Sequence, residues 1–114
     1  MTGYEVGDIV SVEFPFSDLQ GAKRRPGLVL DADSSDVLLA RLTTHPPREK
    51  SDIALMHWAE SGLPRPSTIR LVKLATVDCR LVHHRIGRLA PEDGRAVAQS
   101  WQEFAAHVSD ALPR

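Results

Sequence analysis

Hydrophobic and polar residues alternate over residues 10–14, a pattern that predicts a first β-strand over residues 9–14. One side of this strand carries Ile9, Ser11 and Glu13, and the other carries Val10, Val12 and Phe14. Pro15 ends the strand, because proline has no N–H to donate to a neighbouring strand. Residues 17–23 then form a polar, glycine-containing loop.

Short apolar runs between turn-forming residues predict the rest of a sheet. The expected strands are 27–30, 37–42, 53–56, 68–72 and 86–89. Polar or proline-containing segments separate them at 33–36, 45–50, 61–62 and 64–66. Asp78 is a suitable cap for a helical turn that runs through Leu81.

The last segment changes to a helical period. Pro91 suits a first helical position, and Glu92 and Asp93 complement the positive end of a helix. An apolar stripe follows at helical spacing and is expected to pack on the sheet; it consists of Val97, Trp101, Phe104 and Val108. The sequence therefore predicts one mainly β domain over residues 1–114, a compact barrel-like fold with a C-terminal α-helix.

Composition favours an ordinary globular chain, with 42% hydrophobic and 25% charged residues among 114. No apolar run approaches the roughly 18 residues that span a bilayer. The N-terminal residues lack the basic start and apolar stretch of a signal peptide. A single cysteine, Cys79, allows neither an internal disulfide nor a cysteine-rich metal site. Together these features predict a cytoplasmic protein with no membrane association.

The net charge of −1 hides an uneven distribution along the chain. Residues 20–90 carry 12 Lys/Arg and 7 Asp/Glu, an excess of 5 positive charges. Residues 1–19 and 91–114 together carry 2 and 8, an excess of 6 negative charges. A basic middle of this kind is compatible with binding to a polyanion, although surface lysines and arginines are common in any globular protein.

The strongest cluster of candidate residues is Lys23-Arg24-Arg25 before Pro26. Pro26 restricts Arg25 to extended geometry, so its guanidinium group could be aimed at a phosphate from a strand entrance. A solvated charge run is the alternative interpretation. Thr43 and Thr44 follow an apolar strand, where their hydroxyl groups could bind phosphate or satisfy the turn's own backbone.

Two further features bear on the chemistry. Arg70 points opposite to its apolar neighbours Ile69 and Leu71, which suits an open sheet face. Five histidines raise the possibility of a metal, but the adjacent His83 and His84 diverge on a strand and have no third ligand at a usable spacing. We therefore expect neither a metal site nor a cofactor.

Taken in order, these segments resemble the MazF/PemK family of toxin endoribonucleases. The similarity begins at residues 7–14, is sharpest at 23–30, where Arg24-Arg25-Pro26 looks like the family's Arg-Arg-Pro motif, and includes Leu42-Thr43-Thr44. It continues through residues 66–70, 75–78 and 86–89 and covers roughly residues 6–110.

The resemblance implies an SH3-like barrel that forms a homodimer and is paired with a cognate antitoxin protein. It implies metal-independent, sequence-specific cleavage of single-stranded RNA by attack of the 2′-OH on the adjacent phosphate. By position, the catalytic residues would be Arg25, Thr43 and Arg70. The residues expected to bind RNA are Lys23, Arg24, Arg41, Thr44 and Ser67.

Two departures from the family pattern leave the general base unassigned. Val72 stands where certain relatives place a carboxylate two residues beyond the later arginine. The first loop has Leu19-Gln20-Gly21 in place of the Glu-Gln pair common in many relatives. Two other functions remain open, a non-enzymatic poison of a protein target and an inactive RNA-binding barrel. Gyrase-inhibiting CcdB toxins, which share the fold, depend on a Trp-Gly-Ile terminus, whereas this sequence ends in Ala-Leu-Pro-Arg.

Overall fold

The computed structural model describes residues 3–13 and 24–114. Within these ranges the elements follow in the order β1 (Asp8–Glu13), β2 (Arg24–Ala32), β3 (Asp36–Thr43), β4 (Asp52–Ala54), β5 (Thr68–Asp78), the 3-10 turn η1 (Cys79–Leu81), β6 (Val82–Arg88) and α1 (Pro91–Ala111). Every expected strand is present, although β2, β3, β5 and β6 are longer than the sequence pattern indicated and β4 ends at Ala54, before the expected Leu55 and Met56. Phe14, Pro15 and the loop expected at 17–23 lie outside the described residues.

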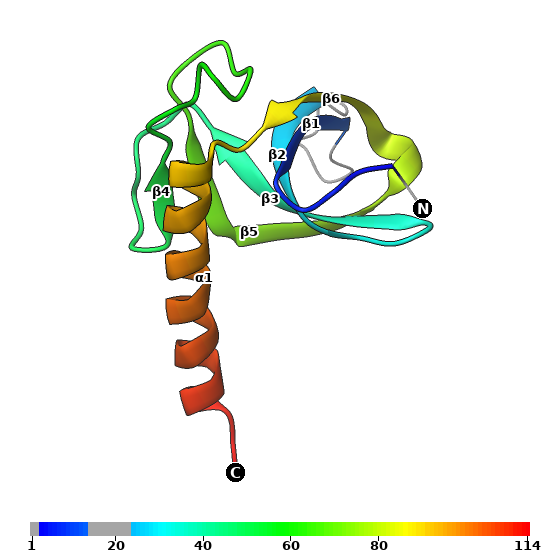
Figure 1. Ribbon diagram of the computed structural model, residues 1–114. Helices are drawn as coiled ribbons and strands as arrows, with labels where there is room; N and C mark the ends of the chain where they lie inside the picture. The colour runs from blue at the N-terminus through cyan, green and yellow to red at the C-terminus, as the bar shows by residue number, and fades with distance from the viewer. Residues whose placement is uncertain (1–2, 14–23) are drawn as a thin grey trace.

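The strands form one antiparallel sheet in the order β4-β5-β3-β2-β1-β6. Figure 1 shows this sheet curled into a small barrel, with α1 beside β4 and β5. Asp78 caps the turn before β6 as expected, since its Oδ1 accepts a hydrogen bond from the N–H of Arg80 at 2.9 Å. The expected barrel-like β domain with a C-terminal helix is confirmed.

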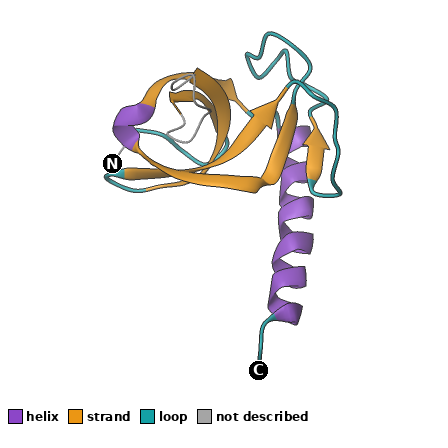
Figure 2. Ribbon diagram, turned by 180° about the vertical axis from the view of Figure 1, so that it is seen from behind, coloured by secondary structure: helices purple, strands orange, loops and turns teal. Residues whose placement is uncertain are grey.

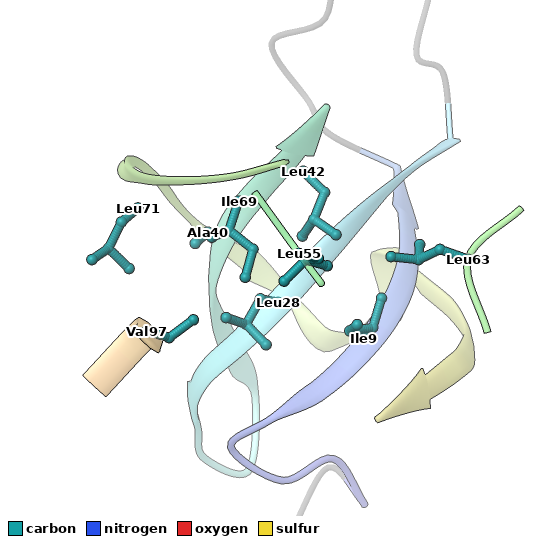
Figure 3. Packing of buried hydrophobic residues seen from close by; sticks show 9 residues of the cluster. All are labelled: Ile9, Leu28, Ala40, Leu42, Leu55, Leu63, Ile69, Leu71 and Val97. Carbon is teal, nitrogen blue, oxygen red and sulfur yellow. The ribbon is translucent and has the colours of Figure 1, made fainter. Parts of the chain in front are cut away.

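Hydrophobic residues are buried on both faces of the sheet, in two clusters. The first lies between the sheet and the start of α1 and contains Ile9, Leu28, Ala40, Leu42, Leu55, Leu63, Ile69, Leu71 and Val97 (Figure 3). The second contains Val10, Val12, Val29, Val37, Leu39, Ala75, Val77 and Val82. Consecutive residues of one strand, such as Ile9 and Val10, enter different clusters because side chains alternate across a strand.

An irregularity in β5 divides the strand: side chains before it enter the first hydrophobic cluster, and side chains after it enter the second. Arg70 pairs with Arg41 of β3, but the next paired position on β5 is Leu74, opposite Ala40. The intervening residues, 71–73, therefore have no counterparts on β3 and bend the strand. Because the bend breaks the alternation that marks a strand, the sequence indicated only residues 68–72 of an element that runs to Asp78.

The expected packing of the whole helical stripe is wrong. Val97 is buried, whereas Trp101 and Val108 are 38% and 39% exposed and Phe104 is only half-buried. A helix of 21 residues is about 31 Å long. It therefore extends past the edge of the sheet, as Figure 2 shows, and its second half has no sheet to pack on. Among the described residues, no helix has the length and apolar character needed to cross a membrane.

Two glycines bring the segment before β5 against β6. Gly62 has φ +89°, and a Cβ atom there would lie 2.7 Å from the backbone oxygen of Ile86. A Cβ atom on Gly87 would lie 2.0 Å from the backbone oxygen of Ser61. Only glycine permits this approach of two backbones. The contact fixes Leu63 and the residues that follow beside Ile86, where they form one wall of a groove described below.

Candidate active site

Charged residues occupy one row across three neighbouring strands. Arg41 of β3 pairs with Arg70 of β5, and Arg70 pairs in turn with Asp52 of β4. Side chains at paired positions share one face of a sheet and lie close together. Gly27 of β2 continues the row opposite Arg41 without adding a side chain. The sheet register thus places two arginines side by side.

This row borders a hollow of about 130 Å³ that is strongly basic. Its lining residues are Arg25, Arg41, Leu42, Thr43, Arg70 and Lys73. Arg25 is the second residue of β2 and lines the hollow, which agrees with its expected place at a strand entrance. Within the described part of the chain, four of the six lining residues are cations and none is a carboxylate. Such a site suits a phosphate group, whose oxygens accept hydrogen bonds from several guanidinium groups at once.

Thr43 supplies the hollow's hydroxyl group. It is the last residue of β3, and its Oγ1 accepts a hydrogen bond from the N–H of His45 at 3.2 Å. A hydroxyl group that accepts one bond still has its own hydrogen to donate. Thr43 therefore combines the two interpretations of its sequence position: it satisfies the turn backbone and can also donate to a bound oxygen.

Among the described residues, two carboxylates contact Arg70 and hold its guanidinium group. Nη2 lies 3.3 Å from Oε1 of Glu49, and Nε lies 3.5 Å from Oδ1 of Asp52. Asp52 is fixed in turn, since its Oδ2 accepts the N–H groups of Arg48 and Glu49. Burial raises the pKa of Asp52, but these two N–H groups and the charge of Arg70 together lower it below its ordinary value of 3.8. Arg70 is thus a positioned cation rather than a solvated one.

A larger groove of about 410 Å³ adjoins the hollow, and Arg25 lines both. The lining residues of this groove are Ser11, Arg24, Arg25, Pro26, Thr44, Leu63, Pro64, Arg65, Ser67 and Ile86. Three arginines and three hydroxyl groups alternate there with apolar surface. A groove with cations and apolar walls fits a segment of nucleic acid, whose phosphates and bases need these two kinds of contact.

The structure brings most of the expected site residues together. Arg25, Arg41, Thr43 and Arg70 meet at the hollow, and Arg24, Thr44 and Ser67 line the groove. The hydroxyl group of Ser67 donates to the backbone oxygen of Arg65 at 2.9 Å, so only its oxygen faces other partners. Lys23 lies outside the described residues.

Sequence reasoning missed Lys73, Arg65, Glu49 and Asp52. The bend in β5 brings Lys73 to the hollow, and no sequence pattern marks that bend. Arg65 lies in a proline-rich segment whose pattern indicates only a connection between two strands. For Asp52, the only available signal was a carboxylate immediately before a short apolar run.

Asp8 and Asp93 are buried and bind groups outside the hollow. Asp8 is buried and lies 3.0 Å from Nη1 of Arg88 and 3.5 Å from Nη1 of Arg85. Asp93, also buried, accepts the N–H groups of Met56 and His57 at 2.9 Å each and so ties the segment after β4 to the start of α1. Over residues 3–13 and 24–114, no three His, Cys, Asp or Glu side chains are grouped so that they could hold a metal ion.

Comparison with known proteins places this fold and site in a class. The model of the PemK-like, MazF-like toxins of type II toxin-antitoxin systems matches residues 5–104. No curated protein matches the chain. Because the family model covers most of its length, the chain belongs to the PemK/MazF-like toxin family.

Solved structures have the same fold. An endoribonuclease in complex with its cognate antitoxin, from a mycobacterial species, superposes with a TM-score of 0.73 at 14% identity, covering 97% of this chain and 100% of that one. The Mycobacterium tuberculosis toxin MazF-mt6 gives 0.65 at 22% identity, covering 82% and 90%. MazF in the MazE–MazF structure from Deinococcus radiodurans gives 0.71 at 15% identity, covering 93% and 96%.

Proposed function

We propose that this toxin is an endoribonuclease that cuts single-stranded RNA without a metal, by attack of a 2′-OH on the adjacent phosphate. One observation carries the proposal: Arg25, Arg41, Arg70 and Lys73 surround a hollow that also holds the hydroxyl group of Thr43. The reaction needs no external nucleophile, because RNA supplies its own 2′-OH, which DNA lacks. What the protein must supply is charge stabilisation and proton transfer.

Arg25 stabilises the negative charge that develops on the phosphate oxygens in the transition state. Its planar guanidinium group can donate two parallel hydrogen bonds to phosphate oxygens, and it holds its proton at neutral pH. We assign it charge stabilisation rather than acid catalysis for that reason. Preorganised donors of this kind contribute several kcal/mol at other active sites.

Thr43 and Arg70 complete the contacts to the reacting phosphate. Thr43 donates its hydroxyl hydrogen to a non-bridging oxygen, since its oxygen already accepts the N–H of His45. Arg70 adds a second guanidinium group, which Asp52 and Glu49 hold in place. The three expected catalytic residues thus act on one phosphate.

The RNA strand on either side of that phosphate lies along the adjoining groove. Arg24 and Arg65 bind its phosphates, and Thr44 and Ser67 offer hydroxyl oxygens to the sugars and bases. Lys23, just before the described start of β2, stays a predicted phosphate contact. Binding of this type weakens as salt rises, because bound phosphates release their counterions.

We further propose that the toxin works in the cytoplasm as a homodimer. A cognate antitoxin protein binds this dimer until the two proteins separate. Exposed Trp101 and Val108 and half-buried Phe104 form an apolar stripe that a second copy could cover. One of the similar solved structures is an endoribonuclease in complex with its cognate antitoxin, and another is a MazE–MazF structure, which supports an antitoxin partner.

Incubation of the purified toxin with end-labelled single-stranded RNA in EDTA tests the function. We expect cleavage that leaves a 2′,3′-cyclic phosphate, because an internal 2′-OH is the nucleophile. A metal-activated water would instead leave a linear phosphate end. Activity that disappears in EDTA and returns with magnesium contradicts the mechanism. Binding without cleavage indicates an RNA-binding barrel, and neither binding nor cleavage indicates a poison of a protein target.

A further inference from the structure

Attack by the 2′-OH requires a group that removes its proton, and the described residues that line the hollow include none. Arginine and lysine side chains hold their protons at neutral pH, and a threonine hydroxyl group is a very weak base. Val72, two residues after Arg70, cannot act either. Within residues 3–13 and 24–114, the candidates for the base are therefore side chains in contact with the lining residues.

Among the described residues, two carboxylates contact Arg70. They differ in burial, and therefore in the role that each can have. The side chain of Asp52 is only 1% exposed, and its Oδ2 already accepts two backbone N–H groups. Its Oδ1 faces the buried Nε of Arg70 at 3.5 Å. A carboxylate surrounded in this way cannot reach a substrate hydroxyl group. Asp52 is a positioning residue for Arg70.

Glu49 is both positioned and accessible. Its Oε1 lies 3.3 Å from Nη2 of Arg70, and its side chain is 47% exposed. Its backbone is anchored at two points, since its N–H donates to Oδ2 of Asp52 and its oxygen accepts the N–H of Asp52 at 3.0 Å. The same guanidinium group that borders the phosphate hollow thus holds an accessible carboxylate.

We propose that Glu49 is the general base of the cleavage reaction, an assignment that rests on the function proposed above. Its carboxylate takes the proton of the 2′-OH while the 2′-oxygen forms a bond to phosphorus. The bond from phosphorus to the 5′-oxygen breaks, and the departing oxygen takes a proton from water. The products are a 2′,3′-cyclic phosphate and a 5′-OH, and Glu49 returns its proton to solvent.

The competing candidate is His45, which borders a small cavity together with Thr43 and Arg70. We favour Glu49 because its side chain contacts Arg70, whereas His45 contacts the site through its backbone N–H, which donates to Oγ1 of Thr43. The two assignments differ in which substitution, Glu49→Gln or His45→Gln, removes the acid limb of the pH–rate profile.

The test is the pH profile of kcat/KM for wild type and Glu49→Gln on a single-stranded RNA that the wild type cuts. Glutamine keeps the size of the side chain and an oxygen for Arg70 but cannot accept the proton. We expect a loss of about 100- to 10,000-fold in kcat with little change in KM, and we expect the variant's residual activity to lack the acid limb of the wild-type pH profile. Glu49→Asp should recover part of the activity.

Two controls separate this role from folding and binding. Glu60→Gln, an exposed carboxylate away from the hollow, should keep wild-type activity. Glu49→Gln should bind the same RNA, with a 2′-deoxynucleotide at the mapped cleavage site, as tightly as wild type does. Full activity of a folded Glu49→Gln protein overturns the assignment, as does a wild-type acid limb that His45→Gln removes and Glu49→Gln leaves in place. A wild type that cuts no RNA refutes the proposed function itself.

Discussion

Nε2 of His57 lies 2.6 Å from Oε2 of Glu92, a contact that joins the segment after β4 to the first turn of α1. The hydrogen bond with Glu92 raises the pKa of His57 above its ordinary value of 6.5, against an opposing effect of burial, and Glu60 adds to the rise. His57 therefore binds its proton more tightly in the folded state than in the unfolded chain.

This contact makes stability depend on pH. A raised folded-state pKa gives stabilisation that is complete below the unfolded value and is lost as pH rises through the folded value. We expect Glu92→Gln to lower the Tm more at about pH 5.5 than at about pH 8.5. Thermal unfolding followed by circular dichroism at both pH values measures this difference. An equal decrease at both would show that the charge of His57 contributes nothing.

Gly87→Ala should destabilise the fold, whereas Gly94→Ala should not. A methyl group on Gly87 meets the backbone oxygen of Ser61 at 2.0 Å, so one of two anchored segments must shift, at about 1–3 kcal/mol. On Gly94, inside α1, the nearest atom is Cδ2 of Leu89 at 4.0 Å. Alanine there should stabilise by about 0.4–1 kcal/mol. Urea unfolding of both variants measures the contrast, and similar free energies of unfolding would refute the close contact.

Arg25→Ala should lower kcat/KM by about 100- to 1,000-fold while leaving the Tm near that of wild type. The guanidinium group acts on charge that develops only in the transition state, so little of the loss should fall on KM. Arg25→Lys should recover little, because an ammonium group cannot reproduce the planar fork. Arg80→Ala is a matched control, since Arg80 is exposed and paired with Asp78 on η1. Full activity of folded Arg25→Ala protein would remove the central residue of the mechanism.

Thr43→Ser should retain more activity than Thr43→Val. Serine keeps the hydroxyl group that accepts the N–H of His45 and donates to the phosphate, whereas valine keeps only the shape. We expect valine to cost about tenfold or more in kcat, from one lost hydrogen bond of about 1.5–3 kcal/mol to a charged group. Steady-state cleavage rates measure it. Equal activity of the two variants would limit Thr43 to its structural role in the turn.

The exposed apolar stripe of α1 indicates where a mutation should weaken the proposed homodimer. Val108→Glu places a charge on the exposed apolar stripe of α1, so it should shift sedimentation from dimer to monomer at micromolar concentration. Ser109→Glu, next to it on the helix but off the stripe, is the control. Because Val108 is 39% exposed in the single chain, the variant should lose little stability as a monomer. A wild type that sediments near 12.6 kDa contradicts the dimer.

The sequence predicted the order of the elements and where Arg25 and Thr43 would lie, because a proline and a strand end mark these positions locally. The prediction failed where the position or burial of a residue depends on a distant part of the chain. The burial of Trp101 depends on how far the sheet extends beneath α1, which periodicity does not contain. The place of Lys73 depends on the bend in β5, and the roles of Glu49 and Asp52 depend on a pairing between β4 and β5.

The crowding of four cations around one hollow has a consequence for the unbound protein. Like charges held close together repel each other. The arrangement that suits a phosphate therefore also lowers the free energy of unfolding. The toxin without its ligand therefore keeps the part of this repulsion that Glu49 and Asp52, which pair with Arg70, do not offset. Any compact polyanion that fits the hollow relieves this repulsion and acts as a folding ligand. The protein should be hardest to unfold when it is occupied and most vulnerable to proteases when it is empty.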